Sequence, residues 1–282
     1  MDKLGIVGVG QMGSGIAEVA AKAGVDVVAL EIDNDLLGSA QARIEKSLRR
    51  AVERGKLDEA EMETALGRIG FTTDLDAMHD RELVIEAATE NEDIKTGIFA
   101  ELDRIAPSSA ILASNTSSLP ITRIARATQR PESVVGMHFF NPVPVMGLME
   151  LVSTVLTSDG VRAAARSFGE DIMGKTVIDA KDRAGFIVNM LLVPYMTEAM
   201  KMYEQGFASA EDIDAGMRLG ANHPMGPLEL ADFIGLDTMK FVADVLFDEF
   251  KQPQYAPPPL LVRMVEAGLL GRKTGRGFYD YS

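Results

Sequence analysis

The chain has 282 residues, of which 46% are hydrophobic and 25% charged, and its formal net charge is −14. This length allows two domains with a sizeable core. The negative charge disfavours a general affinity for nucleic acid or for anionic membranes. The absence of cysteine excludes disulfides, thiol nucleophiles and thiolate zinc sites, and we predict no metal. No stretch approaches the length of a membrane span, and glycines interrupt the apolar start, so we expect a cytoplasmic enzyme.

The first 31 residues predict a strand, a glycine-rich turn, a helix and a second strand. The apolar run 4–7 precedes Gly8-Val9-Gly10-Gln11-Met12-Gly13, and the apolar run 25–30 ends at Glu31. In this pattern Gly8 permits the tight turn, Gly10 lets the backbone approach a pyrophosphate, and Gly13 lets the helix pack on the strand. The first N–H groups of the helix then face the phosphates. The alternative is a chance glycine turn, but the surrounding elements favour a dinucleotide site.

Glu31 favours NAD over NADP. It lies 23 residues after Gly8, near the position of a group that accepts a hydrogen bond from the adenosine ribose 2′-hydroxyl. A carboxylate there repels a 2′-phosphate, and no lysine or arginine follows until Arg43. Asp33 and Asp35 add to the same negative charge.

The rest of the chain predicts an α/β domain followed by helices. A long helical region covers about residues 35–68, and short apolar runs then recur at 83–85, 110–113, 134–137, 148–152 and 176–178. Helical patterns between them predict a Rossmann-type, doubly wound, mostly parallel sheet with helices on both faces. Beyond residue 184 the chain reads as almost wholly helical, with a capping pattern at Ser209 and Asp212 and Pro227 in a first turn. We therefore predict an NAD-binding domain over 1–183 and a helical C-terminal domain over 184–282.

Of the three histidines, His138 is best placed for chemistry. His79 lies in a polar stretch and is expected to be exposed, and His223 is expected at a helix joint, bonded to backbone. His138 closes an apolar strand, and in open α/β sheets the ligand crevice lies at the carboxyl ends of the strands. An imidazole there is suited to accept a proton near neutral pH.

Glu150 is the natural partner for His138. It lies inside the apolar run 148–152, where burying a lone carboxylate is costly. A His138–Glu150 pair would fix the tautomer of the ring and favour its protonated form. The alternative is that Glu150 points to solvent from a half-exposed strand.

A third polar cluster, Ser114-Asn115-Thr116-Ser117-Ser118, follows the apolar run 110–113 at another strand end. Its hydroxyl and amide groups are suited to contact a substrate carbonyl or the nicotinamide ribose. The alternative is a turn followed by an N-cap for the helix after Pro120.

Several motifs distributed over the whole chain resemble the L-3-hydroxyacyl-CoA dehydrogenase family, especially its stand-alone bacterial members that act on 3-hydroxybutyryl-CoA. They lie at residues 8–17, 84–87, 113–119, 136–144, 185–189, 222–226 and 271–280. Together they are far more specific than the glycine-rich turn alone. The chain departs from the usual family pattern at Gly147, Ala184 and Met190, which leaves every expected catalytic group in place.

The resemblance implies reversible NAD-linked oxidation of an L-3-hydroxyacyl-CoA to the 3-ketoacyl-CoA. It implies His138 as catalytic base, Glu150 as its orienting partner, and Ser117 and Asn189 as groups that hydrogen-bond the reacting oxygen. It further implies that the helical domain forms a homodimer interface. The cofactor-contacting positions that it implies are Gly8, Val9, Gly10, Gln11, Met12, Gly13, Glu31, Glu90, Lys95, Asn115, Ser117, Asn141 and Lys273.

A basic helix face is the independent sign of coenzyme A. Arg43, Lys46, Arg49, Arg50 and Arg54 fall within an arc of about 140° on a helix, with Lys56 just beyond. We expect Arg50, Arg54 and Lys56 to hold the phosphates of coenzyme A by charge-assisted hydrogen bonds. The alternative is a solvated helix face, because Glu45 and Glu53 interrupt the positive charge.

Two other functions stay open at this point. Relatives that oxidise sugar acids share the fold, but a sugar acid has no diphosphate for the basic face to hold. A non-catalytic NAD(H)-binding protein would have no need of His138, Glu150, Ser117 and Asn189 together.

Overall fold

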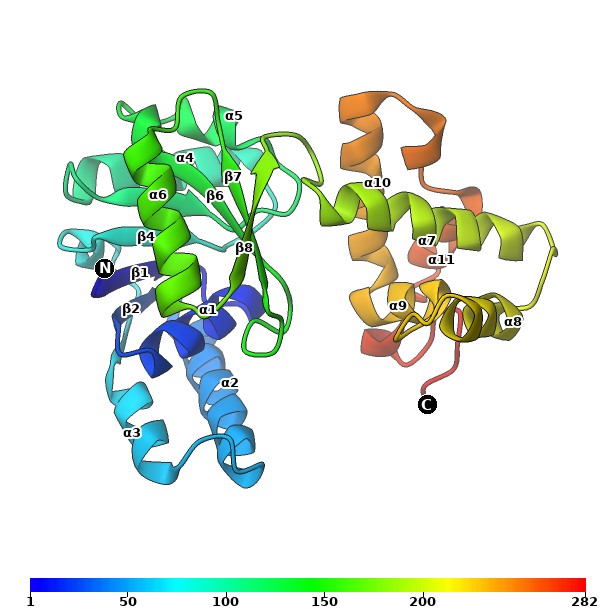
Figure 1. Ribbon diagram of the computed structural model, residues 1–282, viewed down its shortest axis with the longest axis horizontal. Helices are drawn as coiled ribbons and strands as arrows, with labels where there is room; N and C mark the ends of the chain where they lie inside the picture. Colours follow the sequence, from blue (N-terminus) through cyan, green and yellow to red (C-terminus); the bar gives the residue numbers. More distant parts are fainter. The chain divides into compact units, whose positions relative to one another are not determined.

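The computed structural model describes residues 1–282, and the chain divides into two compact units, Met1–Arg183 and Ala184–Ser282 (Figure 1). The first unit is an α/β domain and the second is helical, which is the predicted fold class. No helix in either unit is both long enough and apolar enough to cross a membrane.

The first unit is built on one eight-stranded sheet in the order β3-β2-β1-β4-β5-β6-β7-β8. The strands are β1 (Lys3–Val7), β2 (Asp26–Leu30), β3 (Ile69–Thr72), β4 (Leu83–Glu86), β5 (Ile111–Ser114), β6 (Val134–Phe139), β7 (Leu148–Ser153) and β8 (Thr176–Lys181). All neighbouring strands are parallel except β6 and β7, which are antiparallel. The predicted mostly parallel sheet is therefore confirmed.

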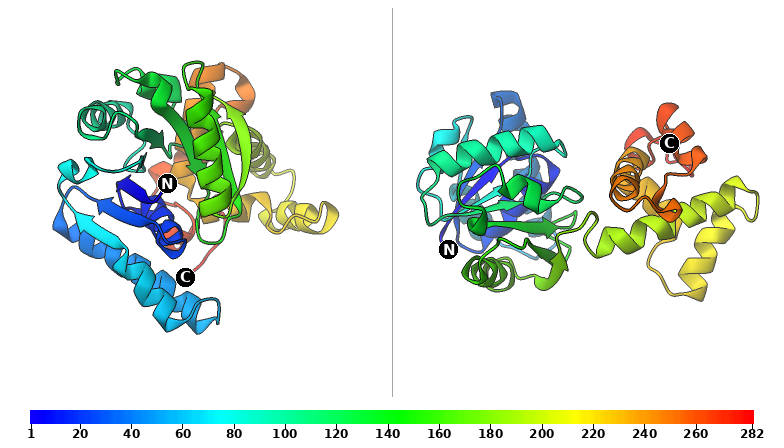
Figure 2. Two further views of the ribbon diagram at one scale, coloured as in Figure 1. Left: turned by 60° about the vertical axis from the view of Figure 1, so that its left-hand side comes forward. Right: turned by 90° about the horizontal axis from the view of Figure 1, so that it is seen from above.

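Helices cover both faces of this sheet, which is why its central strands are continuous apolar runs. They are α1 (Gln11–Lys22), α2 (Asn34–Glu53), α3 (Glu59–Gly67), α4 (Glu92–Ile105), α5 (Ile121–Ala125) and α6 (Asp159–Ser167), with the short segments η1 (Leu75–Met78), η2 (Pro131–Ser133) and η3 (Phe168–Ile172). Side chains of α1, α2 and α6 share one buried cluster with the sheet, as Ile16, Ile44 and Ala165 illustrate. Figure 2 shows α4 and α6 on opposite sides of the sheet.

Two features differ from the sequence prediction. The expected long helix over 35–68 is two helices, because Gly55 adopts a left-handed φ of 65° and Asp58 begins α3 with a capping box. The strand β3 was not predicted. It has four residues, includes Gly70, and is only partly buried, so it lacks the apolar run that marks the other strands.

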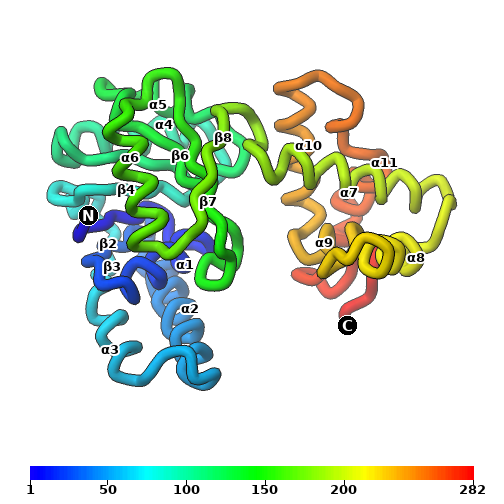
Figure 3. Tube along the Cα trace, in the orientation of Figure 1, coloured from blue at the N-terminus to red at the C-terminus, as the bar shows by residue number.

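The second unit consists of α7 (Val188–Glu204), α8 (Ala210–Ala215), α9 (Pro227–Ile234), α10 (Leu236–Phe250) and α11 (Pro259–Glu266), with the segments η4 (Gly216–Gly220), η5 (Pro253–Tyr255) and η6 (Arg272–Thr274). Figure 3 traces their path. The predicted helix starts are confirmed, since Ser209 caps α8 and Pro227 begins α9. Four methionines, Met196, Met200, Met239 and Met264, lie in the apolar core of this unit.

Two buried aspartates organise the second unit. Asp214 accepts hydrogen bonds from the N–H groups of Leu228 and Glu229, so it caps α9, whose own N-cap is a glycine. Asp232 accepts hydrogen bonds from the N–H groups of Phe278 and Tyr279 and so fixes the C-terminal segment. These bonds satisfy donors that a buried helix end and a buried segment would otherwise leave unpaired.

Candidate active site

The carboxyl ends of β1, β4 and β5 lie at one edge of the sheet, because these strands are parallel neighbours in register. The glycine-rich turn follows β1, Glu86 ends β4, and the cluster 114–118 follows β5. Strand β6 is parallel to β5 and carries His138 one residue before its end. The sheet thus gathers most of the predicted site residues of the first unit at the edge where ligands bind in such folds.

The glycine-rich turn fits a dinucleotide. Gly8 has a φ of 87°, and a Cβ there would lie 2.4 Å from the Cα of Ala88. A Cβ on Gly13 would lie 2.0 Å from the carbonyl oxygen of Gly8, so α1 packs on the turn only with glycine at this position. A Cβ on Gly10 meets nothing within 4 Å. Gly10 is also the N-cap of α1, and no side chain caps this helix end, which is the arrangement that suits binding of a pyrophosphate.

Glu31 directly follows β2, the strand next to β1. Its backbone N–H bonds the carbonyl oxygen of Thr72, and its carboxylate accepts a hydrogen bond from the N–H of Ile32 at 3.2 Å. Its position one strand away from the glycine-rich turn fits the predicted contact with an adenosine ribose.

His138 and Glu150 form the pair that the sequence suggested. They face each other directly in the antiparallel β6–β7 ladder, and Nδ1 of His138 lies 2.7 Å from Oε2 of Glu150. Glu150 is fully buried, and His138 is 6% exposed, so Glu150 does not point to solvent. A carboxylate accepts, so Nδ1 carries a proton, and in the neutral imidazole the lone pair is on Nε2.

The cluster 114–118 is held by two glutamates. Glu86 accepts a hydrogen bond from the hydroxyl of Ser114, and Glu90 accepts one from the hydroxyl of Thr116 and two from Ser117, through its N–H and its hydroxyl. Oδ1 of Asn115 accepts the N–H of Phe139 and so ties this cluster to the end of β6.

The cluster does not cap the helix after Pro120, which was the alternative role predicted for it. The first N–H groups of α5, those of Ile121 and Thr122, donate instead to the carboxylate of Asp182. The cap therefore comes from a residue 60 or more positions away, which no local pattern signals.

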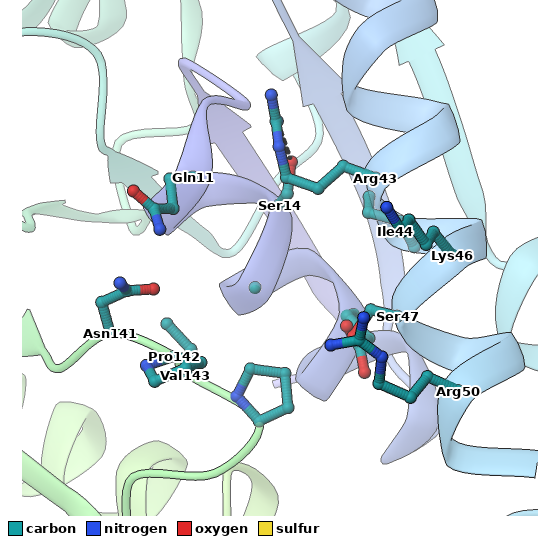
Figure 4. A pocket seen from close by; sticks show the side chains of 13 residues that line it. Gln11, Ser14, Arg43, Ile44, Lys46, Ser47, Arg50, Asn141, Pro142 and Val143 are labelled. Atoms are coloured by element: carbon teal, nitrogen blue, oxygen red, sulfur yellow. Dashed lines mark hydrogen bonds between the residues drawn. The ribbon is translucent and has the colours of Figure 1, made fainter. Parts of the chain in front are cut away.

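A cavity of about 350 Å³ joins the glycine-rich turn to the basic face of α2 (Figure 4). Arg43, Lys46 and Arg50 line it from α2, and the segment 141–144 lines the other side. Arg43 donates hydrogen bonds to the carbonyl oxygen of Val9 and to the hydroxyl of Ser14, so α2 is fastened to the turn. This cavity gives part of the basic face a shape that a phosphate-bearing ligand could enter.

The other cations of the predicted basic face do not line this cavity. Arg49 pairs with Glu45 at 2.9 Å on the exposed surface. Arg54 is the C-cap of α2, and Lys56 lies in the turn beyond it. Of the three basic residues predicted to bind substrate, the structure brings only Arg50 to the cavity wall.

Buried groups that the sequence did not single out shape the same cavity. Glu18 of α1 is 3% exposed, and burial raises its pKa while a hydrogen bond with Ser47 opposes that shift. Lys175 donates hydrogen bonds to the carbonyl oxygens of Val143 and Met146, and burial lowers its pKa. Neither contact has a local sequence signal, because its partners are 29 or more residues apart.

The remaining predicted residues are distributed as follows. Asn141 lines the cavity described above. Lys95 is buried and donates to both carboxylate oxygens of Glu86. In the second unit, Asn189 lies in the first turn of α7, and Lys273 pairs with Asp237 at 2.5 Å.

The two other histidines lie outside the candidate site. His79 is exposed as expected, whereas the ring of His223 bonds the hydroxyl of Tyr195 at 3.1 Å and not the backbone.

Comparison with known proteins gives matches over the whole chain. Residues 3–183 match the family model described as the NAD binding domain of 3-hydroxyacyl-CoA dehydrogenase, and residues 185–281 match its C-terminal domain. A 3-hydroxybutyryl-CoA dehydrogenase of Mycobacterium tuberculosis is 55% identical over 282 residues, which is 100% of this chain and 99% of that protein.

Solved structures agree with this match. The crystal structure of M. tuberculosis FadB2 has a TM-score of 0.99 at 54% identity and covers 100% of this chain and 99% of that one. That of the (S)-3-hydroxybutyryl-CoA dehydrogenase PaaH1 from Ralstonia eutropha has a TM-score of 0.95 at 48% identity, with the same coverage. Since both family domains are matched in order and similarity extends over the full length, the chain belongs to the 3-hydroxyacyl-CoA dehydrogenase family.

Proposed function

We propose that this protein catalyses the reversible NAD-linked oxidation of L-3-hydroxybutyryl-CoA to acetoacetyl-CoA. The observation that carries the proposal is the buried His138–Glu150 pair at the ligand-binding edge of a dinucleotide-binding sheet. Relatives that match this chain over its full length are named 3-hydroxybutyryl-CoA dehydrogenase. They favour this function over that of a sugar-acid dehydrogenase or a non-catalytic protein.

In this proposal Nε2 of His138 takes the proton of the substrate hydroxyl. Glu150 holds the Nδ1–H tautomer and stabilises the imidazolium that forms. Bound NAD would supply the acceptor for the hydride that leaves carbon 3 of the substrate. Ser117 and Asn189, the positions implied by the family resemblance, hydrogen-bond the oxygen on which negative charge develops.

We propose cofactor contacts from the glycine-rich turn and from several later elements. The N–H groups at Gly10–Gly13 hold the pyrophosphate, and Glu31 accepts a hydrogen bond from the adenosine ribose. The family resemblance also implies contacts from Glu90, Asn115, Ser117, Asn141 and Lys273. It implies one from Lys95 as well, but the ammonium of Lys95 is buried and bonded to Glu86.

Arg50 at the cavity wall is the substrate contact that the geometry supports best. Arg54 and Lys56, beyond the end of α2, are proposed as outer contacts to the phosphates of coenzyme A.

The test is steady-state turnover of NADH with acetoacetyl-CoA, compared with turnover of NAD with a sugar acid such as L-gulonate. We expect turnover with acetoacetyl-CoA and none with the sugar acid. Binding of NADH without turnover of any 3-ketoacyl or 3-hydroxyacyl thioester would contradict the proposal and favour a non-catalytic role.

We also propose that the protein works in the cytoplasm as a homodimer through its helical unit. That unit exposes large apolar side chains, such as Leu191, Phe207 and Leu219, which suit a subunit interface. Sedimentation equilibrium tests this, and a mass equal to one chain at micromolar concentration would contradict it.

A further inference from the structure

Glu86 is a fully buried carboxylate to which the proposed mechanism gives no role. It ends β4 with 0% exposure and accepts four hydrogen bonds. Two come from Nζ of Lys95 at 2.7 and 2.8 Å, one from the hydroxyl of Ser114 at 2.8 Å, and one from the N–H of Ala88 at 2.8 Å. A single side chain thus joins β4, β5 and α4 below the ligand-binding edge.

Lys95 stands between two carboxylates. Its Nζ is bonded to both oxygens of Glu86 and lies 3.9 Å from Oε2 of Glu90. Lys95 is 2% exposed, so water does not compensate its charge. The geometry therefore assigns the ammonium to Glu86 and leaves Glu90 to other donors.

Those other donors include the group that the proposed mechanism needs. Oε1 of Glu90 accepts the N–H of Ser117 at 2.7 Å and its hydroxyl at 3.0 Å, and Oε2 accepts the hydroxyl of Thr116 at 2.6 Å. Glu90 therefore fixes the backbone of Ser117 through its N–H. The hydroxyl of Ser117 has one proton, so it turns from Glu90 to the 3-oxygen when the substrate binds.

We propose that Glu86 is a positioning residue for Ser117, acting through Lys95 and Glu90. By holding the Lys95 ammonium, Glu86 keeps Glu90 available to orient the serine that contacts the 3-oxygen of the substrate. This inference rests on the proposed function, because that function gives Ser117 its role.

The substitution Glu86→Gln separates this role from packing, since it removes the charge and preserves the shape. A buried ammonium without its carboxylate is costly, so Lys95 is expected to move to Glu90, the other carboxylate near it. The ammonium would then compete with the Thr116 hydroxyl for Oε2 of Glu90 and turn the carboxylate, which would shift the backbone of Ser117 bonded to Oε1.

The readout is a difference in binding that needs no turnover. Acetoacetyl-CoA has a 3-oxygen and butyryl-CoA does not, so the ratio of their dissociation constants, measured by calorimetry, isolates contacts to that oxygen. We expect Glu86→Gln to shrink this ratio by about two- to tenfold, the range for one hydrogen bond. Butyryl-CoA binding should stay within about twofold of wild type, because its contacts are unaffected.

A double-mutant cycle then tests the route of the effect. Ser117→Ala should shrink the ratio by a similar factor, and the double variant should show no further loss, because both changes act on the same contact. The matched control is Asp103→Asn. Asp103 lies near the C-terminal end of α4 and forms another mostly buried ion pair, with Arg130 at 2.8 Å, which the substitution removes. It should lower thermal stability without changing the ratio.

Three outcomes would overturn the proposal. Equal weakening of both thioesters in Glu86→Gln would mean a general effect on the fold. Multiplying effects in the double variant would mean that Glu86 does not act through Ser117. If the wild-type protein bound both thioesters equally, there would be no contact to the 3-oxygen for Glu86 to position. The proposed function fails separately, by absence of turnover with acetoacetyl-CoA, so the two failures are distinguishable.

Discussion

His138 and Glu150 face each other across the antiparallel β6–β7 ladder, with Nδ1 and Oε2 2.7 Å apart. They are twelve positions apart along the chain but form one rung of the sheet, because the connection after β6 returns the chain antiparallel. The pairing places a base of defined tautomer at the end of a buried strand.

His138→Ala should lower kcat by about 100- to 10,000-fold, the usual contribution of a general base. NADH affinity, measured by fluorescence titration, should stay close to wild type, because the imidazole holds the substrate proton and not the dinucleotide. Comparable loss of both would argue against His138 as the base.

Arg50→Glu should raise KM for acetoacetyl-CoA by about tenfold or more with little change in kcat, because it places a negative charge where phosphates are expected to bind. Arg49→Glu is the matched control, since Arg49 is its neighbour on α2 but pairs with Glu45 outside the cavity. Equal effects of the two substitutions would show that only the overall charge matters.

Glu31→Gln should narrow the preference for NADH over NADPH by about tenfold, because it removes the charge that repels a 2′-phosphate. Asp35→Asn, in the first turn of α2, is the control for overall charge. The measurement is the ratio of the dissociation constants of the two cofactors, and an unchanged ratio in Glu31→Gln would exclude the assigned contact.

Lys175→Met should loosen the segment 143–146, because Lys175 donates to the carbonyl oxygens of Val143 and Met146. We expect a loss of about 1–3 kcal/mol in the free energy of unfolding, the cost of leaving such acceptors without a charged donor. KM for the thioester should rise as well, since Val143 and Pro144 of this segment line the cavity. Lys181→Met, at the exposed end of β8, should do neither.

Glu18→Gln should stabilise the protein increasingly as pH rises. Burial raises the pKa of Glu18 in the folded state above 4.5, so folding favours the protonated carboxyl. The contribution of Glu18 to stability is therefore lost as pH rises from 4.5 through the folded pKa, and the glutamine variant lacks this pH-dependent term. The melting temperatures of the two proteins should be most similar at pH 4, about half a unit below the ordinary carboxyl pKa. They should differ most at pH 7, well above that pKa.

Ser47→Ala should change the stability at pH 7 in the opposite direction, because the hydrogen bond from Ser47 stabilises the ionised form of Glu18. This variant should be less stable than wild type at pH 7. A constant difference between Glu18→Gln and wild type across the pH range would contradict the linkage.

Residues 4–31 alone determined the dinucleotide turn, because the jobs of Gly8, Gly10 and Gly13 depend on neighbours within one strand–turn–helix unit. The alternation of apolar runs with helical patterns likewise determined the mostly parallel sheet and the change to a helical unit. These are local properties, since the residues of one strand or of a few helical turns determine the backbone conformation and the periodic pattern of burial.

Only the tertiary structure decided which side chains meet. The partners of Glu150 and Ser117 lie 12 and 27 residues away, and those of Lys175 and Arg43 lie about 30 away. Strand register and helix packing bring such residues together, and no local pattern records them. For the same reason the sequence left the burial of Glu150 open and did not reveal the role of Glu86 below the site.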